Sequence, residues 1–105
     1  MTLAQWEHPE AVAEFDAAVR WYEAQEPGIG IALIDRAQQS RQDIAHWPNA
    51  APPLTTADDG TVIRTKAVRG YPYRIVYTVE PDAILILAYA HERREPGYWR
   101  HRLSA

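Results

Sequence analysis

Cysteine is absent from this sequence of 105 residues, and long apolar runs are absent as well. Without cysteine the chain can form no disulfide, no thiolate nucleophile and no zinc site built on thiolates, which fits a reducing cytoplasm. The longest strongly apolar run, residues 83–90, is too short to cross a bilayer. No basic segment followed by a long apolar run opens the chain, so we expect no signal peptide. These absences predict a cytoplasmic protein with no membrane partner.

The histidines are few and scattered. They show neither an i, i+4 pair nor the acidic neighbours of a typical metal site: His8, His46, His91 and His101. We therefore expect no bound metal and no cofactor. Hydrophobic residues make up 47% of the chain, with four Trp and six Tyr, which excludes a disordered protein. The length predicts a single domain over residues 1–105.

Charge is divided unevenly along the chain. Residues 1–59 hold three Arg against ten carboxylates, a net charge of −7, whereas residues 60–105 hold eight Arg or Lys against four carboxylates, a net +4. Such asymmetry is typical of a protein with one surface facing an anionic partner. The alternative is that acidic helices pair with a basic sheet inside one domain.

Two helices are predicted in the first half. Pro9 suits the first position of a helix, where its missing N–H costs nothing, and residues 26–28 (Glu-Pro-Gly) end that helix in a tight turn. A second helix is expected from Gly30 to Trp47, stopped by Pro48. Apolar residues at helical spacing mark their buried faces: Ala11, Phe15, Ala18, Val19 and Tyr22, then Leu33, Ile34, Ala37 and Ile44, with Arg41 as the polar exception. The short connection predicts an antiparallel helical hairpin.

The second half alternates with the period of a strand. Strands are expected at residues 61–68, 73–79 and 83–90, with another, short strand at residues 3–7. Residues 49–60 are expected to be a loop, because Pro52-Pro53 and Asp58-Asp59-Gly60 are turn formers. Residues 98–103 are expected to form a short helix or tail. The order β-α-α-β-β-β predicts an α+β fold in which the helical hairpin packs on a small antiparallel sheet.

Three segments together resemble the RelE/ParE toxin superfamily, and the likeness is greatest to the branch called plasmid stabilisation proteins. They are AVRWYEAQEPGIG (18–30), RGYPYRIVY (69–77) and ILAYAHERREPGYWRHR (86–102). The resemblance implies the same fold and a growth-inhibiting toxin of a bacterial type II toxin–antitoxin system. It also implies a cognate antitoxin that wraps the toxin with a segment folding on binding, so we expect a hetero-oligomer. RelE-like members cut mRNA on the ribosome, and ParE-like members inhibit DNA gyrase without catalysing a reaction.

The resemblance also suggests site residues. Metal-independent RNA cleavage needs a base, an acid and cations that stabilise the charged phosphate. Arg74 matches the Arg of the family's Tyr-Arg-Ile-Val-Tyr strand, and Tyr98 matches its C-terminal Tyr. Arg64 and Lys66 lie where a pair of lysines occurs if one gap is allowed. The full candidate set, catalytic in a nuclease and target-binding otherwise, is Arg64, Lys66, Arg74, His91, Arg94 and Tyr98.

The residue at position 92 bears on whether the chain is a nuclease or a gyrase inhibitor. In the simplest register Glu92 stands where active RelE enzymes have an Arg after the last strand. This departure favours gyrase inhibition, so whether the chain is an enzyme at all is left open. The alternatives are a ribosome-dependent mRNA endonuclease and a non-toxic, degenerate member that acts as an interaction module.

Each candidate residue also has a structural interpretation. Arg74 could be a solvated sheet residue, and His91 could simply bond backbone or Glu92. We expect Trp99 in the core and Tyr98 exposed, with the sharp turn at Pro96-Gly97 holding His91, Arg94 and Tyr98 near Arg74. An antitoxin segment could contact the acidic outer faces of the helices and their apolar grooves. The residues proposed for this contact are Glu14, Glu23, Asp35 and Asp43 for the faces and Val12, Phe15 and Ile34 for the grooves.

Overall fold

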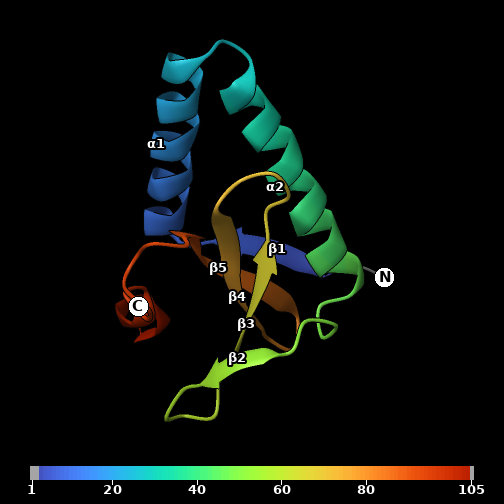
Figure 1. The fold of residues 1–105 in the computed structure, drawn as a ribbon. Coiled ribbons are helices and arrows are strands. Elements are labelled where there is room, and N and C mark those ends of the chain that lie inside the picture. Colours follow the sequence, from blue (N-terminus) through green and yellow to red (C-terminus); the bar gives the residue numbers. More distant parts are fainter. Residues whose placement is uncertain (1–2, 105) are drawn as a thin grey trace.

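The chain folds into two layers, a helical hairpin and a twisted sheet, in a computed structural model that describes residues 3–104 (Figure 1). The elements in chain order are β1 (Ala4–Glu7), α1 (Pro9–Gln25), α2 (Ile29–His46), β2 (Pro53–Thr56), β3 (Val62–Ala67), β4 (Tyr73–Val79), β5 (Ala83–His91) and a 3-10 helix, η1 (Arg100–Ser104). Both predicted helices and all four predicted strands are confirmed. No helix within the described residues is both long and apolar enough to span a membrane.

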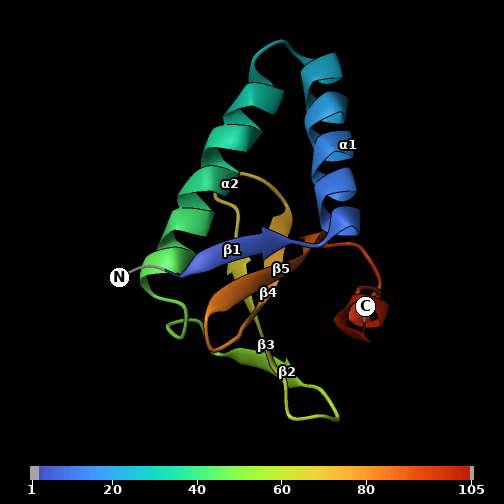
Figure 2. The same cartoon turned by 180° about the vertical axis from the view of Figure 1, so that it is seen from behind.

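The sheet has the strand order β1-β5-β4-β3-β2. Neighbours from β2 to β5 are antiparallel, but β1 pairs in parallel with β5. Seen from behind, β1 lies in the foreground at one edge of the sheet, beside β5 (Figure 2). The α+β class is confirmed, with a mixed sheet in place of a wholly antiparallel one. Parallel strands cannot be joined by a tight turn, and here the connection from β1 to β5 runs through the helical hairpin and then β2, β3 and β4.

The prediction of a loop throughout residues 49–60 was wrong, because β2 lies within it. Pro53 begins this strand and pairs with Arg64 of β3. The strand is at the edge of the sheet, where a missing N–H costs no ladder hydrogen bond. A bulge between Pro53 and Thr55 shifts the register. Proline therefore marks the start of an edge strand here.

Glu23 fixes the turn between the two helices. Its carboxylate, on α1, accepts the backbone N–H groups of Gly28 at 2.9 Å and Gly30 at 3.0 Å, at the start of α2. These bonds, that to Gly28 first, lower the pKa of Glu23. A Cβ on Gly30 would lie 2.5 Å from the carbonyl oxygen of Val19, so the close approach of the helices requires glycine. The Glu and Gly of the first family-like segment thus have a structural role.

Each face of the sheet packs a separate apolar cluster. On the helix-covered face, residues of β4 and β5 such as Ile75 and Ile86 pack with Leu33 and other apolar residues of both helices. Ile34 departs from the predicted apolar stripe, because it is 41% exposed. On the other face, Trp99 covers Val76 and its neighbours with the help of the C-terminal segment. Trp99 is 3% exposed, which confirms its predicted place in the core.

Candidate binding site

The six predicted site residues lie in three separate places. Arg64 and Lys66 alternate with the buried Ile63 of the opposite face, so they point to the side of the sheet that carries α2. Arg64 donates a hydrogen bond to the carbonyl of Ala51. The ammonium of Lys66 lies 3.7 Å from the carboxylate of Asp43 on α2. Both cations therefore face α2 and the segment that follows it.

Arg74 lies on the opposite face. It pairs across the strands with Ala67 and Ala90, and its Nε donates to Thr65 Oγ1 at 3.0 Å. The expectation that Arg74 would meet His91 was wrong, because His91 pairs with Tyr73. Adjacent residues of a strand point to opposite faces, so the register that joins Tyr73 to His91 sends Arg74 away from both. Arg74 is exposed on this second face.

The remaining three predicted residues share a cavity between α1 and the segment after β5. This cavity, of about 390 Å³, is the candidate site, and we call it the α1 pocket. It is lined by Glu14, Ala17, Ala18 and Trp21 of α1, Tyr73 of β4, Tyr89 and His91 of β5, and Arg94 and Tyr98. A larger hollow of about 550 Å³ involves one of the predicted residues, Arg64, and lies at the other end of the sheet. The α1 pocket is the place where predicted residues converge.

Aromatic rings form the walls of the α1 pocket. The His91 ring meets Tyr73 edge-on, with ring centroids 5.1 Å apart. The guanidinium of Arg94 lies 3.9 Å from the centre of the Tyr98 ring, a favourable cation–π contact. Trp21 is 59% exposed at the rim. Trp21 and its neighbour Tyr22 are in edge contact, and Tyr22 packs against the helix-side core while the Trp21 indole is accessible.

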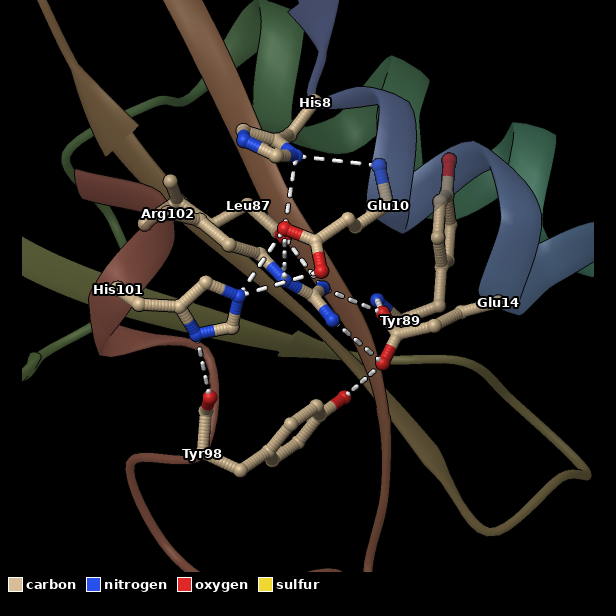
Figure 3. Close-up of polar contacts among 8 residues, drawn as sticks. All are labelled: His8, Glu10, Glu14, Leu87, Tyr89, Tyr98, His101 and Arg102. Atoms are coloured by element: carbon tan, nitrogen blue, oxygen red, sulfur yellow. Dashed lines mark hydrogen bonds and ion pairs between the residues drawn. The ribbon is translucent and has the colours of Figure 1, made fainter. Parts of the chain in front are cut away.

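Glu14 lines this pocket and is the centre of a set of polar contacts that were not predicted from the sequence. Figure 3 shows these contacts. Its carboxylate accepts hydrogen bonds from both terminal nitrogens of Arg102, at 2.7 and 3.2 Å, and from the Tyr98 hydroxyl at 2.5 Å. The side chains of Glu14 and Arg102 are 17% and 5% exposed. The prediction that Tyr98 would be exposed was wrong, because the phenol reaches inward to this carboxylate. Burial, and then the bond to Glu14, raise the pKa of Tyr98.

The pair of Glu14 and Arg102 also completes the hydrogen bonding of β5. Strand β1 ends at Glu7, opposite Ile86, so the outer edge of β5 continues beyond it. There the carbonyl of Leu87 accepts from Arg102 at 2.9 Å, and the N–H of Tyr89 donates to Glu14 at 3.2 Å. Buried backbone groups need partners, and here side chains provide them where the strand has stopped. One of these hydrogen bonds is made by Arg102 and the other by Glu14, so both members of the ion pair are needed to satisfy the backbone of β5.

A second carboxylate secures the C-terminal segment to the start of α1. The imidazole Nε2 of His101 lies 3.0 Å from Glu10 Oε2, and Arg102 Nε lies 3.8 Å from the same oxygen (Figure 3). His8 caps the helix, since its Nδ1 accepts the N–H of Glu10 at 3.1 Å. Part of the acidic charge of the first half is therefore neutralised internally by the basic second half.

These interactions leave fewer free carboxylates on the helix surface that was proposed for antitoxin contact. Glu14 points inward, Glu23 caps α2, and Asp43 faces Lys66. Arg94, in contrast, forms no ion pair with any described residue. The α1 pocket consequently offers a partner one cation and a set of aromatic rings, because its carboxylate already accepts four hydrogen bonds, from Arg102, Tyr98 and the Tyr89 N–H.

The order of elements and the two-layer arrangement define a ParE-like α+β fold. No family model matches the chain, and no curated protein was found to match it. Among solved structures it is similar to a chain of the "Chromosomal ParDE TA system from P. aeruginosa", with a TM-score of 0.71 and 16% sequence identity. The match covers 86% of this chain and 96% of that one. At this identity the likeness establishes a shared fold.

Proposed function

We propose that this protein is the toxin of a type II toxin–antitoxin system. The observation that carries the proposal is a fold shared over 86% of the chain with a member of a ParDE toxin–antitoxin structure. The three sequence segments that resemble the RelE/ParE superfamily support it independently. In this proposal the toxin acts in the cytoplasm and is neutralised by a cognate antitoxin in a hetero-oligomer.

Within this class we propose inhibition of DNA gyrase by binding, without catalysis. Support comes from the separation of the candidate residues. Arg74 lies on one face of the sheet, while Arg64 and Lys66 lie on the other, and the Tyr98 hydroxyl donates a hydrogen bond to Glu14. A nuclease needs its base, its acid and its cations around one phosphate. A binding surface can instead use cations at several places.

A ribosome-dependent mRNA endonuclease is the second candidate. The observation favouring it is that His91, Arg94 and Tyr98 line one pocket. The Nδ1 of His91 accepts the N–H of Arg93 at 3.0 Å, so Nε2 carries the proton of the neutral ring. Such a ring could exchange protons with a bound substrate.

Expression of the chain from a tightly controlled promoter tests the class. We expect growth to stop on induction and to recover when the adjacent small open reading frame is co-expressed. Growth that continues despite confirmed soluble expression would contradict the toxin proposal and favour a non-toxic interaction module.

A gyrase supercoiling assay run beside an in vitro translation assay tests the target. We expect loss of supercoiling with intact mRNA. Cleavage of mRNA within codons that disappears in Arg74→Ala and Tyr98→Phe would contradict gyrase inhibition. Arg20→Ala is the matched control, because Arg20 is an exposed arginine on α1 outside the α1 pocket.

A further inference from the structure

We infer that the α1 pocket binds an acidic peptide segment of a partner protein, with one apolar side chain inserted between Trp21 and Tyr98 and a carboxylate paired to Arg94. The cavity, the accessible indole and the unpaired guanidinium are independent observations on the same site.

The pocket has the size and lining of an anchor site. Its volume of about 390 Å³ lies toward the small end of the range for ligand pockets, about 300–1,000 Å³. The lining from α1 includes two small residues, Ala17 and Ala18, and most of the remaining lining residues carry aromatic rings. Buried aromatic or aliphatic anchors in such hollows supply most of the energy of peptide binding. An apolar side chain is thus the natural occupant of its centre.

The rim of the pocket carries an arginine that is available to a negatively charged group of a partner. Arg94 lies over Tyr98 and forms no ion pair with the described residues, so its donors remain available to a carboxylate. Arg93 and Arg100 are exposed in the same C-terminal segment. His91 adds a ring N–H to the lining. A carboxylate beside the apolar anchor would gain a charge-assisted hydrogen bond from Arg94.

A peptide fits these features better than a nucleic acid. Glu14 lines the pocket, and Glu10 and Asp16 lie along the same helix. A continuous phosphate backbone passing α1 would meet these carboxylates, whereas a peptide can place its acids at Arg94 alone.

Binding of a dye-labelled peptide to the full chain tests the inference. The probe is a short peptide with a central Phe between two Leu and with two Glu at one end only, and its binding is followed by fluorescence anisotropy. We expect saturable binding that weakens with added salt. Two comparison peptides, one with Gln for Glu and one with Ala for Leu and Phe, should each bind about tenfold more weakly, a loss of about 1.4 kcal/mol.

Variants of the protein locate the binding site. Arg94→Gln and Trp21→Ala should each weaken binding about tenfold, the effect of losing one anchor contact. The matched controls are Arg69→Gln and Trp6→Ala, which remove an exposed arginine and a 67% exposed tryptophan outside the pocket, and they should bind like the unmodified chain. Circular dichroism should show that all four variants are folded, since each substituted side chain is exposed.

Three results would overturn the inference. They are no binding of the acidic peptide by the unmodified chain, equal losses in the pocket and control variants, and binding of a single-stranded oligonucleotide in place of the peptide that depends on Arg94. That the natural source of the segment is the antitoxin rests on the proposed function. Peptide binding and growth arrest are separate measurements, so a non-toxic chain that binds the peptide through Arg94 and Trp21 would contradict the toxin proposal alone.

Discussion

The two faces of the sheet are covered in different ways. One face carries two long helices, and its apolar cluster draws on α1, α2, β4 and β5. The other is covered in part by the C-terminal segment, chiefly through Trp99 and Leu103. The helix layer is held by its own backbone hydrogen bonds and by Glu23, whereas the C-terminal segment depends on side chains such as Arg102 that reach α1 and β5.

The helix layer determines the fold, whereas the C-terminal segment helps to form the candidate site. The helix-covered face contains the residues whose spacing predicts the architecture. The α1 pocket lies where the C-terminal segment meets α1, so its walls come from segments distant in sequence. Local stability is lowest where buried apolar contacts are few and backbone hydrogen bonds are exposed to solvent. We therefore expect the C-terminal segment to open before the helical layer does.

Trp99→Ala should give the largest effect. Removal of a buried Trp costs about 3–5 kcal/mol in the free energy of unfolding, measured by urea denaturation. Hydrogen exchange should become faster first in residues 96–104. Leu33→Ala, at a residue 1% exposed on the helix-covered face, is the comparison and should accelerate exchange throughout the core. Equal exchange patterns in the two variants would remove the distinction between the faces.

Glu14→Ala should be nearly as damaging, with a loss of about 3 kcal/mol, because it removes the nearest carboxylate from the buried Arg102 guanidinium. A second substitution in the same chain, Arg102→Met, should restore much of the loss, since it removes the stranded charge. Asp16→Ala, at an exposed carboxylate of the same helix, is the control and should change stability little. A double variant no more stable than Glu14→Ala would show that the ion pair is not what Glu14 contributes.

Glu23→Gln should give the smallest effect, a lower melting temperature at neutral pH. The pKa of Glu23 is lowered in the folded state, so its contribution is present above the ordinary value of 4.5 and is lost as the pH falls through the folded pKa. The difference in melting temperature between the variant and the unmodified chain should therefore shrink in acid. Glu26→Gln, at an exposed carboxylate in the same turn, is the control. A difference that is constant with pH would exclude a role for the charge.

Periodicity was sufficient to predict the helices and the longer strands. Apolar spacing in α1 and α2 and alternation in β4 reflect local geometry, which a short window of sequence records. The edge strand β2 was missed because Pro53 has a different meaning at the edge of a sheet. The parallel partner of β1 was not predicted, because pairing with β5 joins segments about 80 residues apart, as in Ala4 with Ala83.

The candidate site was predicted less completely. His91, Arg94 and Tyr98 were expected to lie together, and they do. Arg74 was misplaced because the cross-strand register decides which face it takes. Glu14 was read as an outer-face carboxylate, although its position between Ala11 and Ala18, both buried, was an available signal that it turns inward. The contribution of Arg102 depends on a contact across 88 residues, which local sequence patterns do not record.

The bonds from Glu14 and Arg102 to β5 also bear on solubility. An uncovered strand edge offers unpaired N–H and C=O groups to any other extended chain, which is a common route to aggregation. Here the N–H of Tyr89 and the carbonyl of Leu87 are already occupied by side chains. A foreign strand could add at this point only by separating a buried ion pair. Glu14 and Arg102 therefore protect this part of the β5 edge from pairing with a strand of another chain.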